Sequence, residues 1–543
     1  MSIKTNIARH QNRFIGYWGN GNTQQLQRLV EHDWVIIPPP VSGSLISLSA
    51  AGLPPDDVWV RVDGNYLILG REVFGRVTLY WLQIDGVIWF SSQFQLLLPL
   101  VPEPQVSLPA LYGYSCFSYI PTPLTPITQI MAVAAGTEQV WLAEAGKISP
   151  QSTRGLVDWS EAKTQLADES IAVGELQTLL VAAMERQTSD LRGKTVGVFL
   201  SGGLDSSIVA ALLVRAGVKV RAYSLDFGVG EMSEYPYAAQ VAEYLQIPLV
   251  KVDATPGTVR QAVLATIQSL DVPFGDGVTV PLYLLNQAAS LDVDIVFNGE
   301  GGDQLFAGWT NKPLIAASIY QSVHPDGGEC FSDRYLRTFH RLWGYEAQVF
   351  SSEVYGQIKH IRPQDWLEGA LDETFSHALI HRLRRASLLL KGAQNIQPRA
   401  TNLAFAHSLQ VRSIFCDREL ARWTFGVAGS LYLRGACEKY ILKRAVEGWL
   451  PPEIVWREKR GMGVPLTSWC LGKWWGDLGR WLSSGGCWRA DVAVRVALGD
   501  LGFRGRRVGE ILWLLVSWDL WWGGSRGWRF WVPFWVWKRV RGG

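Results

Sequence analysis

The segment with the clearest chemical potential is Ser201–Ser207, SGGLDSS. The apolar run Val196–Leu200 before it predicts a buried strand, and the small and apolar residues of Ser206–Val214 predict a helix. A glycine turn between strand and helix presents free backbone N–H groups and the positive helix end to an anion. The segment lacks the lysine and the spacing of the Walker loop. Asp205 stands among the anion donors and would repel a phosphate unless a divalent cation lay between them, so the loop also predicts Mg²⁺.

A second acidic loop follows another predicted buried strand, Asp294–Asn298, and reads GEGGDQ over Gly299–Gln304. Its glycines let the backbone approach a ligand closely. Asp303 is placed to share a Mg²⁺ with Asp205 across a pyrophosphate, and Glu300 could orient an acyl substrate or accept a proton from an attacking amine. The alternative is an ordinary glycine-rich turn with solvated acids.

Strands and helices alternate around these loops, which is what could bring them together. The predicted elements, in chain order, are a helix over Glu175–Gln187, the first strand and helix, a strand over Val218–Asp226, a helix over Tyr235–Leu245 and a strand over Leu249–Val252. The alternation predicts a doubly wound, mostly parallel α/β sheet. Ligands of such sheets lie at the carboxyl ends of the strands, at the switch point of the strand order.

Both loops resemble signatures of the asparagine synthetase family, whose members cleave ATP between the α and β phosphates. SGGLDSS resembles its pyrophosphate loop and NGEGGDQLFAGW its second signature, with Gln304 where a glutamate is usual and Asn298 where a serine is common. The resemblance implies an ATP-pyrophosphatase fold of the adenine nucleotide α-hydrolase kind, with ATP and Mg²⁺ as cofactors. It implies metal ligation by Asp205 and Asp303, adenine and ribose flanked by Leu200 and Leu225, and further ATP or pyrophosphate contacts from Ser201, Gly202, Gly203, Leu204, Ser206, Ser207, Asn298 and Gly299.

A third signature, EKYILKRAVEGWLPPEIVWREKRGMGVP at 438–465, resembles the stretch that supplies the family's lysine over the α-phosphate. A cation there stabilises the transition state more than the ground state, because charge moves onto the bridging oxygen. Lys459 is the candidate for this catalytic lysine. Lys439 is either a secondary phosphate contact or a surface residue.

The segment AHSLQVRSIFCDRELARW, 406–423, resembles the stretch that lines the family's substrate pocket, which implies Arg412 and Asp417 as pocket residues. Gln410 stands where a glutamate is usual and Thr401 where an aspartate is usual. Both changes make the pocket less suited to the ammonium group of a free amino acid. Asp276, in PFGD before the second loop, receives no firm role, and a helix-capping acid is an equal interpretation.

Residues 1–165 predict an antiparallel, sheet-rich domain. Strand-like runs separated by Gly, Pro and Asp are Val58–Val62, Tyr66–Leu69, Val77–Ile84 and Val87–Phe90. YLILGREVFGRVTLYW and GVIWFSSQFQLLL resemble the second half of an N-terminal-nucleophile glutamine amidotransferase domain. Those glutaminases use an N-terminal cysteine whose own amino group acts as base.

That nucleophile is missing here, since the second residue is Ser2 and the first cysteine is Cys116. The first strand of such a domain corresponds to Phe14–Trp18, which would leave Ser2 on an extension of about a dozen residues. We therefore expect no glutamine hydrolysis, and a domain that is a structural relic or a cradle for a different substrate.

Length and composition fit a two-domain globular protein with a tail. The 543 residues carry a net charge of +2, which gives no electrostatic case for nucleic acid. Six scattered cysteines without metal-ligand spacing predict reduced thiols in the cytoplasm, and no signal peptide is apparent. The expected division is 1–165, 166–522 and a Trp/Arg/Gly-rich tail, 523–543. That tail is a membrane-surface segment, a packed arm or missense sequence from a frame shift. We favour the last, because glycine, tryptophan and arginine dominate from about Gly472. No bilayer-spanning run precedes residue 510.

The sequence thus predicts an AMP-forming amide synthetase that adenylates a carboxylate and passes it to an amine. We favour lactam or isopeptide formation, as in the β-lactam synthetases and lasso-peptide cyclases of this family, with a precursor peptide and a leader-processing partner. The alternatives are an asparagine synthase and a non-catalytic binding homologue.

Overall fold

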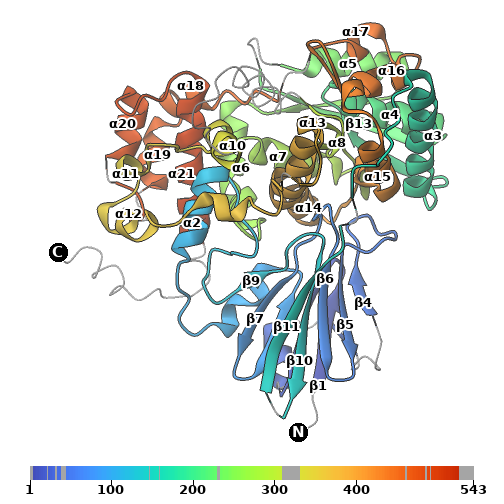
Figure 1. Cartoon of the computed structure of the whole chain (residues 1–543). Helices are drawn as coiled ribbons and strands as arrows, with labels where there is room; N and C mark the ends of the chain where they lie inside the picture. Colours follow the sequence, from blue (N-terminus) through green and yellow to red (C-terminus); the bar gives the residue numbers. More distant parts are fainter. Residues whose placement is uncertain are drawn as a thin grey trace.

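The computed structural model describes the chain except for residues 1–3, 21–22, 31–33, 38–44, 146, 158, 229–232, 309–330, 373, 459–460, 483–485, 490 and 525–543. Antiparallel sheets from residues 4–155 form the lower half in Figure 1, and an α/β body with its helices forms the upper half. The predicted α/β class is confirmed.

Two antiparallel sheets make up the N-terminal part. The first contains, in spatial order, β3 (Val35–Ile37), β1 (Lys4–His10), β2 (Arg13–Gly19), β8 (Val87–Ser91), β7 (Tyr80–Ile84) and β9 (Met131–Ala132). The second contains β11 (Lys147–Gly155), β10 (Thr137–Glu144), β6 (Tyr66–Arg71), β5 (Val58–Asp63) and β4 (Leu45–Leu48). The predicted sheet-rich region is confirmed, although the strand expected over Val77–Ile84 begins only at Tyr80.

The extension expected before Phe14 is wrong, because β1 pairs with β2 along its whole length, from Lys4 opposite Gly19 to His10 opposite Arg13. Alternate residues of β1 point into the core, with Ile7 fully buried. The polar residues between them hid this alternation in the sequence. Ser2 itself lies outside the described residues.

The α/β body is built on a five-stranded sheet in which every neighbouring pair is parallel. Its order is β14 (Leu249–Asp253), β13 (Lys219–Asp226), β12 (Thr195–Phe199), β15 (Ile295–Phe297) and β16 (Gln410–Arg412). The chain therefore builds outward from β12 in one direction and then returns to build outward from β15 in the other. This puts the switch point between β12 and β15, the strands that lead into the two acidic loops.

Helices cover both faces of this sheet, as the doubly wound prediction requires. Alternate residues of β13 belong to different cores: Ala222 packs with helices α3 (Glu169–Thr188), α4 (Leu204–Arg215) and α5 (Tyr235–Leu245). Tyr223 and Leu225 pack with α6 (Pro256–Gln268), α7 (Thr279–Ala289) and the N-terminal sheets. Near-continuous burial along β13 is what a strand covered on both faces requires.

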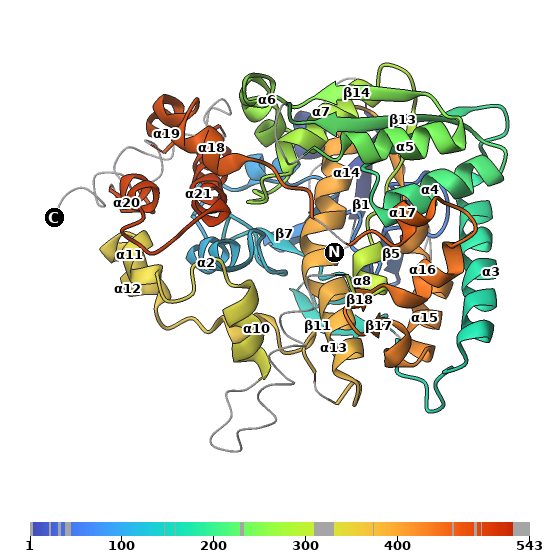
Figure 2. The ribbon, with the colours of Figure 1, turned by 90° about the horizontal axis from the view of Figure 1, so that it is seen from above.

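The remaining elements flank this core. Near the sheet lie α8 (Gly302–Leu305), α13 (Leu379–Ser387), the π-helix η5 (Leu388–Ile396), α14 (Gln397–Phe405), α15 (Arg418–Gly426), the hairpin β17 (Leu433–Arg434) and β18 (Cys437–Glu438), α16 (Tyr440–Val446) and α17 (Pro452–Val455). A second helical group, separate from α3–α5 in Figure 2, comprises α2 (Leu108–Phe117), α10 (Phe331–Phe339), α11 (Glu346–Val349), α12 (Ser352–Ile358), α18 (Leu466–Leu471), α19 (Trp475–Trp481), α20 (Val492–Leu498) and α21 (Arg506–Gly524). Helix α1 (Thr23–Leu29) lies against β1 and β2.

The tryptophan-rich residues that follow position 472 contribute to this helical group. Trp474, Trp513 and Trp518 are fully buried, and the Tyr114 hydroxyl of α2 donates to the Leu514 carbonyl of α21 at 2.8 Å. The expected closing helix over Arg506–Trp522 is confirmed as α21. Residues 525–543, where the tail was expected, lie outside the described part.

Among the helices that the structure describes, none combines the length and apolar character needed to cross a bilayer.

The N-terminal sheets are tied to the α/β body by buried polar contacts. Arg71 donates to the Ala393 carbonyl of η5 at 3.2 Å, and Arg412 donates to the Ala51 carbonyl at 2.9 Å. Asp271, after α6, accepts the backbone N–H of Phe94 at 3.2 Å and the side-chain amide of Asn402 at 3.1 Å. The two parts therefore share one buried interface.

We expect this interface to weaken as pH rises through the neutral range. Burial raises the pKa of Asp271 from 3.8 to about 7. A carboxyl group whose pKa is raised in the folded state binds its proton more tightly there, so it stabilises the folded state fully below about pH 4. That contribution to the free energy of unfolding is lost as the pH rises toward 7, at about 1.4 kcal/mol per pH unit at most. In Asp271→Asn, the melting temperature should therefore fall less than in wild type between pH 4.5 and 8, measured by scanning fluorimetry. Exposed Asp500→Asn serves as the control, and parallel pH profiles for wild type and Asp271→Asn would contradict the prediction.

Candidate active site

The loop after β12 is held in shape by its own serines. The Ser201 N–H donates to the Ser206 hydroxyl at 3.2 Å, and the Gly203 N–H donates to the Ser201 hydroxyl at 3.2 Å. The Ser207 hydroxyl donates to the Gly203 carbonyl at 2.9 Å. Gly202 has φ of +69° and a Cβ there would lie 2.5 Å from Tyr237, so only glycine fits. The result is a fixed turn at the N-terminus of α4, as predicted for an anion site.

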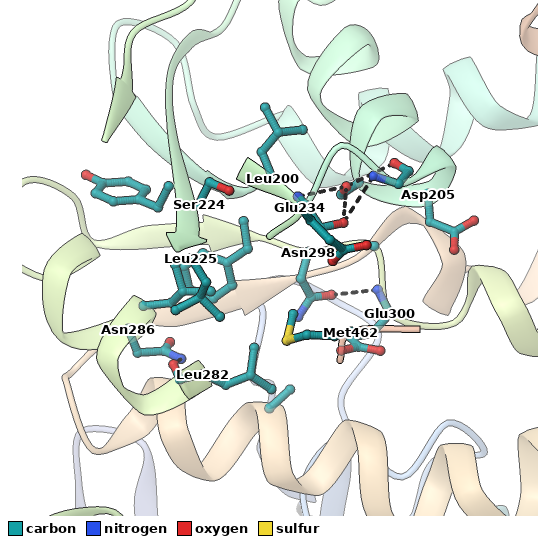
Figure 3. Close-up of a pocket in the computed structure, with 18 of the residues that line it drawn as sticks. Leu200, Asp205, Ser224, Leu225, Glu234, Leu282, Asn286, Asn298, Glu300 and Met462 are labelled. Carbon is teal, nitrogen blue, oxygen red and sulfur yellow. Dashed lines mark hydrogen bonds between the residues drawn. The ribbon is translucent and has the colours of Figure 1, made fainter. Parts of the chain in front are cut away.

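The loop after β15 is fixed in a similar way. The Asn298 side-chain oxygen accepts the Glu300 N–H at 3.2 Å (Figure 3), and the Ser413 hydroxyl donates to the Glu300 carbonyl at 2.7 Å. Gly301 has φ of +105°, which favours glycine, and α8 follows with Asp303 in its first turn. These contacts fix the backbone positions from which the side chains of Glu300 and Asp303 extend.

The two loops touch through glycines. A Cβ on Gly299 would lie 2.8 Å from the Ser206 backbone nitrogen and 3.0 Å from the Asp205 carbonyl carbon. A Cβ on Gly302 would lie 2.5 Å from the Asp205 carboxylate. Backbone contact this close needs residues without side chains, and it brings Asp205 and Asp303 to one point.

Lys439 joins the two acids at that point. Its Nζ lies 2.5 Å from Asp205 Oδ2 and 2.5 Å from Asp303 Oδ1. The side chain is 2% exposed, and the residue has φ of +54° at the start of α16. The surface interpretation of Lys439 is therefore wrong. Its ammonium group lies between the carboxylates, where the sequence predicts a cation.

The donor set also fits Mg²⁺. Two carboxylates from loops at one strand edge are hard oxygen ligands, and Mg²⁺ keeps its remaining positions for phosphate oxygens and water. In the described part of the chain, no group of three or more His, Cys, Asp or Glu residues is arranged to hold a metal. Asp205 and Asp303 would therefore hold the ion together with the phosphates of a nucleotide.

Two further basic residues, Lys443 and Arg457, lie beside the turn Ser201–Ser207, and the sequence did not predict a role for them. Lys443 is buried, and its ammonium donates to the Arg457 carbonyl at 3.3 Å and lies 3.7 Å from Glu438. The Arg457 guanidinium stacks 3.5 Å from the centre of the Tyr237 ring. A small cavity beside the turn is lined by Gly203, Leu204, Glu234, Glu438, Lys439, Lys443, Ile454, Arg457 and Glu458. Lys459 lies outside the described residues.

The main pocket opens over the carboxyl ends of β12, β13 and β15. The predicted site residues that line it are Leu200, Ser201, Gly203, Asp205, Ser206, Leu225, Asn298, Gly299, Glu300 and Asp303. Gly202, Leu204 and Ser207 do not line it, and Leu204 faces the small cavity instead. Away from Asp205 the wall becomes apolar, with Leu282, Leu285, Leu403, Val411 and Met462; Leu282 and Met462 are labelled in Figure 3.

Arg412 and Asp417 do not line this pocket, which corrects the expectation from the sequence. Arg412 is fully buried and pairs with both carboxylate oxygens of Asp190, at 2.6 and 2.9 Å. Asp417 caps α15 by accepting the Leu420 N–H at 3.0 Å and pairs with Arg186. Both side chains make structural contacts instead of facing the pocket. The sequence around them does not indicate these contacts.

Asp276 is a half-buried charge centre rather than a capping acid. Its carboxylate accepts from Asn395 and from Arg399, both at 2.9 Å. Burial alone would raise the pKa of Asp276, but the positive charges of Lys391, Arg399 and Arg341 bring it well below its ordinary value. The group anchors η5 and α14 behind the pocket.

Comparison with known proteins now decides the family. A profile described as asparagine synthase matches residues 175–517, which contain both loops and Lys439. The chain belongs to the asparagine synthase family. Enzymes of this family are ATP-dependent carbon–nitrogen ligases, and the expectation of such a ligase is confirmed at this level.

Curated members of the asparagine synthase family are distant relatives of this chain. Asparagine synthetase [glutamine-hydrolyzing] 1 of Bacillus subtilis is 24% identical over 435 residues, covering 76% of this chain and 67% of that protein. A putative asparagine synthetase [glutamine-hydrolyzing] of Mycobacterium tuberculosis is 25% identical over 434 residues, covering 74% and 65%. The chain thus spans about two thirds of the length of these relatives.

Two solved structures also match. NMN synthetase from Francisella tularensis has a TM-score of 0.19 and 20% identity, covering 26% of this chain and 58% of that one. NH3-dependent NAD synthetase from Campylobacter jejuni has a TM-score of 0.18 and 16% identity, covering 39% and 80%. These scores are too low to add to what the strand order establishes.

The contact between the loops gives a direct prediction. Gly299→Ala should push the loop after β15 away from Asp205, and a displacement of about 1 Å at a reacting centre costs on the order of 100-fold in rate. The measurement is ATP-dependent pyrophosphate release. Gly174→Ala is the matched control, because a Cβ at that helical position meets nothing within 4 Å. Equal rates for the two variants would contradict the prediction.

Removing the bridging ammonium tests the cation site. In Lys439→Met, Asp205 and Asp303 lose the cation between them, so we expect a lower melting temperature in EDTA that Mg²⁺ largely restores. The same titration of exposed Lys473→Met should follow wild type. A Lys439→Met melting temperature that does not respond to Mg²⁺ would count against a metal site here.

Proposed function

We propose that this protein is an AMP- and pyrophosphate-forming amide synthetase that adenylates a carboxylate on a peptide or amino-acid derivative and transfers it to an amine. The observation that carries the proposal is the convergence of Asp205, Asp303 and Lys439 beside the N-terminus of α4. Two carboxylates, an ammonium group and backbone N–H donors at the carboxyl edge of one sheet suit a triphosphate with its metal.

The first step joins the substrate carboxylate to the α-phosphorus of ATP. The bond from the α-phosphorus to the bridging oxygen breaks, and its electron pair leaves with pyrophosphate. The turn Ser201–Ser207 would bind the departing pyrophosphate through backbone N–H groups, while Asp205 and Asp303 would hold the Mg²⁺ that accompanies it. Lys439 and Lys443 are placed beside the turn, and Lys459 remains our candidate for the cation over the α-phosphate.

In the second step an amine attacks the carbonyl carbon of the acyl-adenylate, and AMP leaves with the electrons of the broken C–O bond. The attacking nitrogen must lose a proton. Glu300 lines the pocket on the loop next to Asp303 and is the proposed acceptor.

One observation favours a substrate other than aspartate. Gln410, which replaces the family's usual glutamate, accepts a hydrogen bond from Arg412 at 3.2 Å and packs against Gly52 of the N-terminal part. This position therefore offers no carboxylate to the ammonium group of a free amino acid, which suits a lactam- or isopeptide-forming substrate presented in the cytoplasm by a precursor peptide.

Asparagine synthesis is the second candidate, because the curated relatives carry that name. A non-catalytic homologue is the third. Pyrophosphate release is measured with ATP plus aspartate and ammonia or glutamine, and separately with a carboxylate-bearing peptide encoded nearby. Release only with the peptide supports the proposal, release with aspartate supports asparagine synthesis, and no release from a folded protein supports the binding homologue.

The paired acids should be indispensable for adenylation. Asp205→Asn and Asp303→Asn each remove one charge that holds the metal, and we expect pyrophosphate release to fall about 100-fold or more. The exposed acid Asp253, at the end of β14, provides the control variant Asp253→Asn. Activity retained in either loop variant would overturn the metal assignment.

A further inference from the structure

The apolar end of the main pocket contains one amide that its surroundings leave unsatisfied. Asn286 lies on α7, lines the pocket and is only 2% exposed. Its Nδ2 donates to the Leu282 carbonyl at 2.8 Å. Its Oδ1 has no hydrogen-bond partner among the residues that the structure describes. An acceptor buried in this way destabilises the protein unless a ligand supplies a donor.

The orientation of this amide is fixed by its single partner. The Leu282 carbonyl can only accept, so it must face the NH2 group of Asn286. The side-chain oxygen is therefore the atom left for a ligand. Any group that satisfies it must donate a hydrogen bond.

The position of Asn286 in the pocket determines which part of a bound ATP its side chain can contact. Figure 3 shows Asn286 at the opposite end of the pocket from Asp205, beside Leu282 and below Leu225. With the phosphates at Asp205, the ribose lies in between and the base reaches the far end. Leu225, Leu282 and Leu285 give that end the apolar walls that a flat base requires.

We propose that Asn286 is a specificity-determining residue whose Oδ1 accepts a hydrogen bond from the exocyclic amino group of adenine. The inference rests on the proposed use of ATP. Adenine carries one donor group, the amino group on C6, whereas inosine and guanosine carry a carbonyl oxygen there. That oxygen would face the Asn286 oxygen without a hydrogen between them, so ITP should bind more weakly than ATP.

The test compares dissociation constants of Mg²⁺-bound ATP and ITP by isothermal titration calorimetry, for wild type and Asn286→Leu. One neutral hydrogen bond corresponds to roughly 5- to 10-fold in affinity. Wild type should prefer ATP by at least that factor. In Asn286→Leu the affinity for ATP should fall by about that factor and the preference should largely disappear. Gln287→Leu removes an exposed amide from the next position of α7 and should keep the wild-type preference.

Further arms keep the outcomes separate. If circular dichroism shows that Asn286→Leu is unfolded, the comparison is made with Asn286→Ala instead. A wild-type preference that persists in the variant overturns the inference. So does a loss of affinity for ATP in the variant that 2′-deoxy-ATP does not show, which would make a ribose hydroxyl the donor. Wild type that binds neither nucleotide would instead overturn the proposed function itself.

Discussion

The site depends on two carboxylates being held within reach of one cation. Asp205 and Asp303 come from loops about a hundred residues apart in sequence, and both lie 2.5 Å from the Lys439 ammonium. Like charges this close are unfavourable unless a cation lies between them. The glycine contacts that force the loops together therefore require a positive charge at that point, from Lys439 or from a metal bound with a nucleotide.

The strand order makes this meeting possible. Because β12 and β15 are neighbours at the switch point, their loops leave the same edge of the sheet side by side. The helices that cover the two faces of the sheet have different roles at the site. On one face α4 presents its N-terminus to the anion site, and on the other α7 and α14 close the apolar end of the pocket.

What the sequence could predict was set by local signals. The strand–turn–helix at residues 195–215 and the glycine loop at 299–304 are determined by neighbouring residues, and their positions were correct. The places of Lys439, Arg412 and Asp417 depend on partners more than 200 residues away, so similarity of motif led to the wrong environment for Arg412 and Asp417 and left Lys439 undecided between a phosphate contact and the surface. Strand β1 was missed because its pairing with β2 and β3, rather than its own apolar content, defines it.

The contacts that Arg412 and Arg71 make between the N-terminal sheets and the synthetase carry a consequence for how such a chain can evolve. Each guanidinium crosses from one part to a backbone carbonyl of the other, at Ala51 and at Ala393. A gene fission that separated the sheets from the synthetase would leave both cations facing solvent-filled gaps and would loosen η5 behind the pocket. The synthetase must therefore keep the N-terminal sheets as part of its own scaffold.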